Sequence, residues 1–304
     1  MNDDVYGIKK WGNDILEILE NGNIGLKNPF HPDNSPADLI KIIKSLNERG
    51  ISCPVLLRVT DYLAFRIKQI NNSFFRAIRE IRYKGEYKGV FPVKVNQQAQ
   101  VIDRIVEFGK EFDFGLEVGS KPELLIALAH DLSANSTIIC NGIKDREFIH
   151  LAILSIKIGF KTILVLESPR ELDLIIKISK ELNVRPLLGI RVKLTNKVSG
   201  NWSQSSGDRS AFGLSVEQVM EVINKLKIYD YLDCLILQHS HLGSQIPDII
   251  EIRKATQEAC RFFSEMSKLG APLTYLDLGG GLGVDYTGEQ KSAFNSINYS
   301  LDEY

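Results

Sequence analysis

The sequence predicts an α/β fold arranged as a (β/α)₈ barrel, and three observations support this prediction. From about residue 89 onward, short apolar or β-branched runs alternate with longer segments of helical period. This alternation is typical of parallel strands joined by crossover helices. Seven such runs follow one another, whereas a doubly wound sheet normally needs about five or six strands. No GxGxxG sequence follows the first run, and a glycine cluster comes late in the chain, where barrels commonly bind phosphate.

The predicted strands are residues 89–95, 112–117, 136–140, 161–167, 186–192, 234–241 and 274–279. Two of the intervening helices begin with the same design. Ser120-Lys121-Pro122-Glu123 and Ser168-Pro169-Arg170-Glu171 each offer a serine N-cap, a proline in the first turn and a capping glutamate. They precede the apolar helical segments 124–129 and 172–182. Two helix starts of one design, each after a strand, indicate repeated βα units.

The first 88 residues have a different pattern. Residues 11–26 are mixed, residues 28–33 are rich in turn formers, and residues 53–59 form a further apolar run. We expect residues 1–88 to form part of a second, β-rich domain with a lead-in helix, and residues 89–304 to form the barrel domain. A polar connection at residues 195–209 interrupts the βα rhythm, and Asp208 and Arg209 belong either to a substrate contact or to a surface loop.

Composition excludes several classes of function. The chain has 304 residues, 44% of them apolar, with 37 basic and 38 acidic side chains, so no net field attracts nucleic acid or an acidic membrane surface. Its four cysteines lack CxxC spacing, which argues against a zinc motif or a disulfide framework. The first residues lack a signal-peptide pattern, and no stretch reaches the roughly 18 apolar residues of a membrane span. We therefore expect a cytoplasmic protein.

Two sequence features suggest a phosphorylated aldehyde cofactor. Gly279, Gly280 and Gly281 directly follow an apolar strand, and their bare backbone could either cradle a phosphate or form a tight turn. Lys94 stands at the end of the first predicted strand. A lysine there is either a solvent-facing side chain or an amine that bonds covalently to the aldehyde.

In a barrel, the carboxyl ends of all strands face one mouth, so Lys94, Glu117, Asn141, His241 and Gly279 are expected to converge. His239 and His241 fall on one face of their strand, where they could form a metal pair. Packing of His241 against a flat cofactor, with Ser244 near its phosphate, suits the pattern better, and His239 suits a core position. Glu123 is also a natural helix cap, and Asp277 could orient a neighbouring amide.

The motifs resemble the biosynthetic arginine decarboxylases, which share the alanine racemase and ornithine decarboxylase barrel of the fold-type III pyridoxal-phosphate enzymes. The resemblance runs nearly end to end, through GVFPVKVNQQ, GLEVGSKPEL, CNGIKDREFI, PLLGIRVKL, QSSGDRSAFGL, HSHLGSQI and LDLGGGLGVDY. It implies that Lys94 holds pyridoxal 5'-phosphate, that His241 stacks on its ring, and that Ser244 and the three glycines bind its phosphate. It further implies that Glu117 and Glu123 lie near the cofactor. The implied substrate-binding stretch comprises Leu276, Asp277, Leu278, Gly279, Gly280, Gly281, Leu282, Gly283, Val284, Asp285 and Tyr286.

The same resemblance implies decarboxylation of L-arginine to agmatine and CO₂ for polyamine biosynthesis, with Mg²⁺ as an accessory ion and homo-oligomers in the full-length enzyme. The family's acid-x-Gly-Arg sequence of the eighth strand and its later β-domain do not occur in these 304 residues. We interpret the chain as an N-terminal portion with a barrel truncated after the seventh strand, and expect it to be inactive alone. Two alternatives remain: a decarboxylase of ornithine, lysine or diaminopimelate, and a non-catalytic pyridoxal-phosphate-binding homologue.

Overall fold

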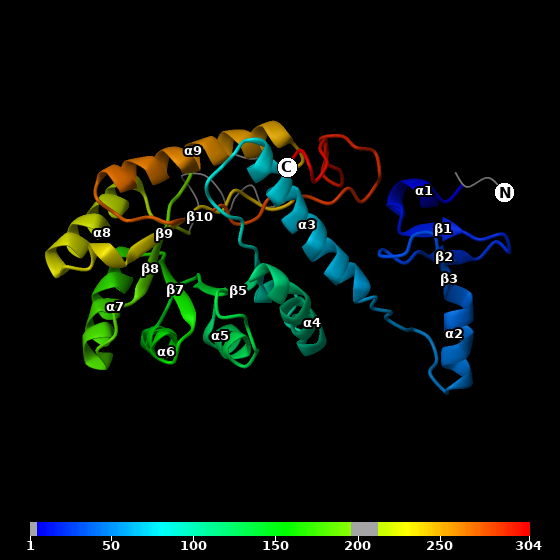
Figure 1. The fold of residues 1–304 in the computed structure, drawn as a ribbon, viewed down its shortest axis with the longest axis horizontal. Helices are drawn as coiled ribbons and strands as arrows, with labels where there is room; N and C mark the ends of the chain where they lie inside the picture. Colours follow the sequence, from blue (N-terminus) through cyan, green and yellow to red (C-terminus); the bar gives the residue numbers. More distant parts are fainter. Residues whose placement is uncertain (1–4, 196–211) are drawn as a thin grey trace.

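A seven-stranded parallel sheet forms the centre of the computed structural model, which describes residues 5–195 and 212–304. The strands pair in strict chain order. They are β4 (Val90–Pro92), β5 (Gly115–Val118), β6 (Thr137–Cys140), β7 (Lys161–Leu166), β8 (Leu187–Arg191), β9 (Leu235–His239) and β10 (Tyr275–Asp277). Within the described residues, β4 and β10 are the two edges and do not pair, so the sheet is an open, curled half-barrel (Figure 1). All seven predicted strands are confirmed.

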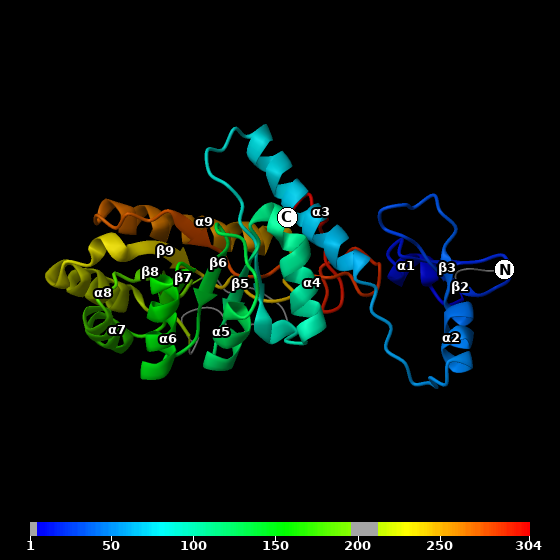
Figure 2. The same cartoon turned by 60° about the horizontal axis from the view of Figure 1, so that its bottom comes forward.

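Helices alternate with these strands and cover the outer face of the sheet, as Figures 1 and 2 show. They are α4 (Ala99–Gly109), α5 (Lys121–Leu128), α6 (Arg146–Lys157), α7 (Pro169–Leu182), α8 (Val216–Tyr229) and α9 (Ile249–Lys268). Two parallel strands need such a crossover because the chain leaves one strand at its carboxyl end and must return to the other end of the sheet to begin the next strand. The predicted βα repeat is therefore confirmed.

The two similar helix starts form as predicted at the serine and the proline, but the predicted capping by the glutamates is not met. Glu123 accepts from the N–H of Gly119 and the hydroxyl of Ser120, and Glu171 accepts from the N–H groups of Lys144 and Glu167. Ser120 caps α5 by accepting the N–H of Glu123, and Ser168 caps α7 by accepting the N–H of Arg170. Each proline lies in the first turn, where its missing N–H costs nothing. These caps fix where each chain segment leaves its strand, and so fix the loops at the carboxyl edge of the sheet.

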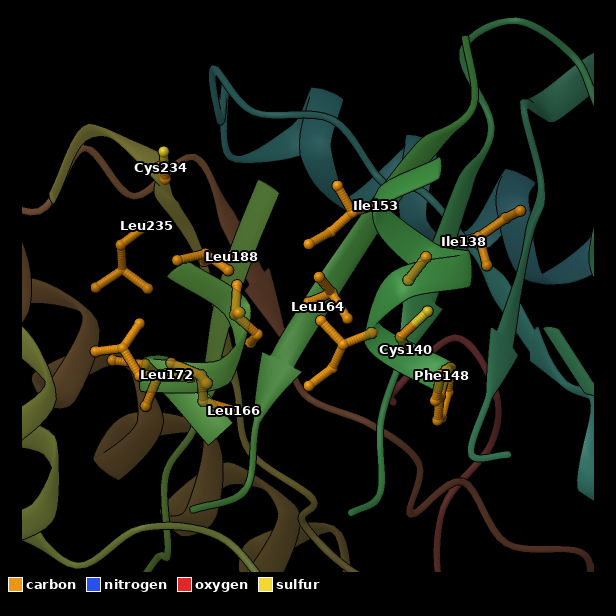
Figure 3. Close-up of a cluster of buried hydrophobic side chains, with 14 of the residues drawn as sticks. Ile138, Cys140, Phe148, Ile153, Leu164, Leu166, Leu172, Leu188, Cys234 and Leu235 are labelled. Carbon is orange, nitrogen blue, oxygen red and sulfur yellow. The ribbon is translucent and has the colours of Figure 1, made fainter. Parts of the chain in front are cut away.

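The main hydrophobic core lies between the sheet and its helices (Figure 3). Strand side chains alternate between two faces. Ile138, Leu164 and Leu188 pack toward the helices, whereas Ile139, Ile163, Val165 and Leu237 form a separate cluster on the inner face. Glu117 lies between two helix-facing neighbours, Leu116 and Val118, and thus shares the inner face. This alternation directs selected polar residues toward the hollow of the half-barrel.

The N-terminal residues form a small antiparallel sheet of β1 (Leu16–Ile18), β2 (Ile24–Leu26) and β3 (Ala37–Asp38). Helices α1 (Ile8–Trp11) and α2 (Leu39–Glu48) flank it, and α3 (Asp61–Glu80) leads into the barrel beside α4. The sequence expectation of β structure and a lead-in helix is met. The apolar run at residues 53–59 forms neither helix nor strand.

The C-terminal segment returns to α3 (Figure 1). Ser73 Oγ donates a 2.7 Å hydrogen bond to Asp302, and the ring of Phe74 contacts the ring of Tyr304 edge-on at 6.3 Å between centroids. Phe74 also stacks on Tyr87 at 3.8 Å. These contacts hold the segment that follows the glycine loop against the helix that precedes β4.

Candidate cofactor site

The carboxyl edge of the sheet gathers the polar residues that could perform chemistry. Because the strands are parallel, the residues at and just beyond their carboxyl ends lie along one edge. In strand order these are Lys94, Glu117, Asn141, Glu167, Arg191, His239 with His241, and Asp277 with Gly279. The predicted convergence at one mouth is therefore met at the level of the fold, and the contacts below define it further.

Lys94 lies in a short 3₁₀ turn (Val93–Val95) just beyond β4. The sequence placed it within a longer strand, but β4 ends at Pro92, which has no N–H to continue the ladder. Lys94 Nζ is 3.4 Å from Glu117 Oε1, and Asn141 Nδ2 donates to the same oxygen at 3.2 Å. The Lys94 side chain is 63% exposed and that of Glu117 only 8%. A reachable amine thus stands beside a buried carboxylate.

A second buried ion pair lies at the ends of β7 and β8. Arg191 Nη1 donates to Glu167 Oε1 at 2.8 Å, and Glu167 also accepts the backbone N–H groups of Gly142 and Gly213. Burial opposes ionisation of Glu167, but the charge and hydrogen bond of Arg191 outweigh it and lower the pKa of this carboxyl. The Arg191 guanidinium also lies over the ring of Phe212 at 5.2 Å. Sequence reasoning did not single out Glu167 or Arg191, although Glu167 ends one predicted strand and Arg191 is the next-to-last residue of the following one.

The glycine loop turns sharply at its first residue. Gly279 has φ +66°, a conformation that glycine adopts without steric cost, and its N–H donates to Asp277 Oδ1 at 2.8 Å. The expectation that Asp277 orients a neighbouring amide is thereby met. Tyr299 OH accepts the N–H of Gly283 at 2.9 Å and donates to the carbonyl of Ile246 at 2.8 Å. The loop is therefore held at both ends.

The two histidines lie against this loop. A methyl group on Gly279 would be 2.9 Å from His241 Nδ1 and 3.2 Å from His239 Cε1, so only glycine fits there without displacement. His239 Nδ1 is 2.9 Å from Asp277 Oδ2. Burial, followed by the charges of His239, Arg191 and Lys94, lowers the pKa of His241 to about 4. His241 is consequently a neutral, flat ring at neutral pH.

Three further predicted residues occupy different settings. Glu123 Oε2 accepts the N–H of Gly119 at 2.8 Å and Oε1 accepts the hydroxyl of Ser120 at 3.0 Å, so its carboxylate serves the start of α5. Ser244 is exposed in the loop after His241. In the stretch 276–286, Asp285 accepts backbone N–H groups of residues 287, 288 and 290 and shapes its own turn. Their cofactor and substrate roles remain predictions.

The donor set of this edge fits a phosphorylated aromatic aldehyde. Within residues 5–195 and 212–304, the N–H groups of Gly280 and Gly281 donate to no protein acceptor. A glycine backbone with unpaired N–H groups is suited to bind phosphate. A neutral imidazole offers a face for a ring, and an exposed amine offers a nucleophile. The buried Asn141 Oδ1 also lacks a hydrogen-bond partner among the described residues.

Two negative findings apply to the described residues. No group of three or more His, Cys, Asp or Glu side chains there could hold a metal ion, which leaves the two histidines without a third ligand. No helix in residues 5–195 or 212–304 has the length and apolar character needed to cross a membrane. Asp208 and Arg209, considered above for a substrate contact, lie outside the described residues.

Comparison with known families identifies the domain. Residues 67–304 match the family described as "pyridoxal-dependent decarboxylase, pyridoxal binding domain". The chain belongs to this family. The pyridoxal-binding domain begins within α3 and includes every site residue discussed above. Membership in this family supports pyridoxal phosphate as the cofactor of this domain.

Two of the chain's curated relatives are biosynthetic arginine decarboxylases. A biosynthetic arginine decarboxylase of Prochlorococcus marinus strain MIT 9312 is 47% identical over 299 residues, covering 98% of this chain and 46% of that protein. The protein of the same name from Gloeobacter violaceus is 44% identical over 301 residues, covering 99% of this chain and 47% of its own length. The chain thus spans about half the length of the curated relatives it matches.

Solved structures agree with the fold. The biosynthetic arginine decarboxylase SpeA of Campylobacter jejuni has a TM-score of 0.85 at 35% identity, covering 98% of this chain and 47% of that one. Diaminopimelate decarboxylase of M. jannaschii, in complex with L-lysine, has a TM-score of 0.68 at 24% identity and shares the fold. Its match covers 90% of this chain and 58% of the M. jannaschii chain. The predicted barrel of decarboxylase type, with an antiparallel sheet at the N-terminus, is confirmed.

Proposed function

We propose that this chain provides the cofactor-binding part of an enzyme that decarboxylates L-arginine to agmatine and CO₂, and so serves polyamine biosynthesis. The curated relatives named above and the solved C. jejuni structure, all called biosynthetic arginine decarboxylases, support arginine as the substrate. The observation that carries the proposal is the Lys94–Glu117 pair at the same sheet edge as His241 and the glycine loop.

Each residue then has a specific task. When bound, pyridoxal phosphate supplies an aldehyde for covalent attachment and a ring that withdraws electrons from the bond to be broken. Lys94 holds the aldehyde carbon, and Glu117 balances and orients the Lys94 amine. His241 presents its neutral face to the ring. The N–H groups of Gly280 and Gly281, with the hydroxyl of Ser244, bind the phosphate.

Other expected contributions are more distant from the ring. Glu123 stiffens the loop between β5 and α5, close to Glu117 in sequence. We assign the stretch 276–286 to the substrate side of the site, with the exposed Tyr286 as its outermost member. We also propose that residues 1–88 belong to a β-rich domain distinct from the barrel domain of residues 89–304.

Three further properties are proposed from the resemblance and composition. We propose a homo-oligomeric enzyme with a cytoplasmic location, from the resemblance and from the near-neutral net charge of the sequence. Magnesium is proposed as an accessory ion without assigned ligands, and no catalytic task is given to it. Activity measured with and without a chelator tests the ion directly.

A substrate panel tests the function. The full-length enzyme that contains this chain is purified and incubated with pyridoxal phosphate and with arginine, ornithine, lysine or diaminopimelate, and CO₂ and the amine product are measured. We expect agmatine from arginine and loss of that product in Lys94→Ala, but not in Lys110→Ala, a surface lysine paired with Asp131. Product from another amino acid would reassign the substrate. Cofactor binding without any product would support a non-catalytic homologue.

A further inference from the structure

We propose that Asp277 is a positioning residue that joins the glycine loop to the two histidines, and that it fixes which nitrogen of His239 carries a proton. The inference rests on the proposed function, because the loop and His241 are the parts of the site that would hold the cofactor. Asp277 would act through these neighbours and would make no contact with substrate.

The register of two strands brings Asp277 and His239 together. β9 and β10 are parallel, and Asp277 pairs directly with His239 at their carboxyl ends. Paired residues in neighbouring strands project to the same face. Asp277 Oδ2 lies 2.9 Å from His239 Nδ1, and the His239 side chain is almost fully buried. The contact therefore joins two strands of the sheet, and Asp277 lies just before the glycine loop in the chain.

The second carboxylate oxygen reaches the loop. Asp277 Oδ1 accepts the N–H of Gly279 at 2.8 Å, at the residue where the backbone takes its left-handed turn. One oxygen of the Asp277 carboxylate thus contacts His239 of β9, and the other accepts from the N–H of Gly279. Burial opposes ionisation of Asp277, but the charge and hydrogen bond of His239 outweigh it and keep the pKa of this carboxyl below its ordinary value.

An ionised carboxylate has acceptors and no donor, so the facing His239 Nδ1 must carry the proton. An asparagine at position 277 would change this. Its oxygen could still accept from Gly279, but its NH₂ group would then face His239 and require an unprotonated Nδ1. The substitution Asp277→Asn should therefore leave Nδ1 of His239 without a proton and Nε2 with one, while it keeps the size of the side chain at position 277.

The loop transmits this arrangement to His241. Gly279 lies so close to both rings that a methyl group would meet His241 Nδ1 at 2.9 Å and His239 Cε1 at 3.2 Å. A shift of Gly279 therefore changes the space available to the His241 ring. His241 is also sensitive to the charge of His239. Loss of the Asp277 carboxylate is expected to disturb both the loop and the ring beside it.

The test compares Asp277→Asn and Asp277→Ala with a matched control, Asp113→Asn. Asp113 is also a carboxylate with a lowered pKa, held by Lys88 at 2.8 Å and by Ser133 at 2.6 Å, but it precedes β5 at the opposite edge of the sheet. Nitrogen-15 NMR of the histidines in cofactor-free protein reports the tautomer of His239. Titration with pyridoxal phosphate reports the dissociation constant.

We expect Asp277→Asn to leave His239 protonated at Nε2 alone. We also expect pyridoxal phosphate binding to weaken about 10-fold, because the N–H of Gly279 loses its hydrogen bond to a charged acceptor. Asp277→Ala should weaken binding at least as much, and Asp113→Asn should change neither quantity. An unchanged His239 tautomer in a folded Asp277→Asn protein would overturn the inference, as would unchanged cofactor affinity. Wild-type protein that binds no pyridoxal phosphate would instead contradict the proposed function, and the tautomer would still test Asp277.

Discussion

Lys94, in the turn after β4, faces Glu117 of the neighbouring strand β5, with Lys94 Nζ 3.4 Å from Glu117 Oε1. The lysine is largely exposed, whereas the carboxylate is buried and also accepts from Asn141. A buried carboxylate with two donors is fixed in position, so it can hold the flexible lysine side chain near one place. The Lys94 ammonium group at the mouth of the half-barrel therefore has a defined location and remains exposed to solvent.

The first prediction concerns this pair. Glu117→Gln keeps the shape of the side chain but removes the charge opposite Lys94. In the full-length enzyme we therefore expect at least about a 10-fold loss of kcat with arginine, since hydrogen bonds to charged groups contribute about 1.5–3 kcal/mol. Steady-state kinetics check this. Glu107→Gln is the control, because Glu107 pairs with Arg104 on the surface of α4. Equal activities of the two variants would contradict the assigned role of Glu117.

The second prediction uses a matched pair of glycines. Gly279 and Gly50 both have positive φ, but a methyl group at Gly50 would meet nothing within 4 Å. Alanine at either position should cost about 1 kcal/mol of unfolding free energy from backbone strain. Gly279→Ala should in addition displace His241 and lower cofactor affinity, measured by titration with pyridoxal phosphate. Similar affinities of Gly279→Ala and Gly50→Ala would argue against a cofactor role for this loop.

The third prediction is a pH dependence of stability. The pKa of His241 is about 4 in the folded protein, below its unfolded value of about 6.5, mainly because of burial. The unfolded chain therefore binds this proton more readily, and stability that is fully present above about pH 6.5 is lost as the pH falls toward about 4. The shift corresponds to at most about 3 kcal/mol.

Urea unfolding of cofactor-free protein across this pH range measures the effect. In His241→Phe, which keeps a flat ring without a titrating nitrogen, the loss of stability toward acid pH should be smaller than in the wild type. Carboxylates distant from His241 contribute equally to both proteins, so the difference reports His241 together with its electrostatic interaction with Asp277. Parallel pH profiles would show that His241 is not held neutral by the fold.

The fourth prediction tests the core between the sheet and its helices. Ile153 of α6 is fully buried there, whereas Ile158, five residues later, is 73% exposed (Figure 3 shows Ile153). Ile153→Ala should lower the free energy of unfolding by about 2–5 kcal/mol, and Ile158→Ala by less than about 0.5 kcal/mol. Thermal or urea unfolding distinguishes them. Comparable losses of unfolding free energy in the two variants would contradict a core between the sheet and its helices.

The sequence predicted the strands well because most of them combine β-branched residues with boundaries of glycine, proline or capped helices. Lys94 was expected in a strand, but Pro92 ends the ladder, and the following turn depends on the local backbone. Glu167 and Arg191 were missed although they lie at or next to the ends of predicted strands. Their ion pair also needs the N–H groups of Gly142 and Gly213, which are far away in the sequence. Sequence periodicity does not contain such tertiary contacts.

The central claim is that Lys94 carries pyridoxal phosphate. The protein is incubated with the cofactor, reduced with borohydride to make any lysine linkage permanent, digested and examined by mass spectrometry. We predict a pyridoxyl adduct on the peptide that contains Lys94, and its loss in Lys94→Ala while Lys110→Ala retains it. An adduct on a different lysine, or no adduct in folded wild-type protein, would contradict the account.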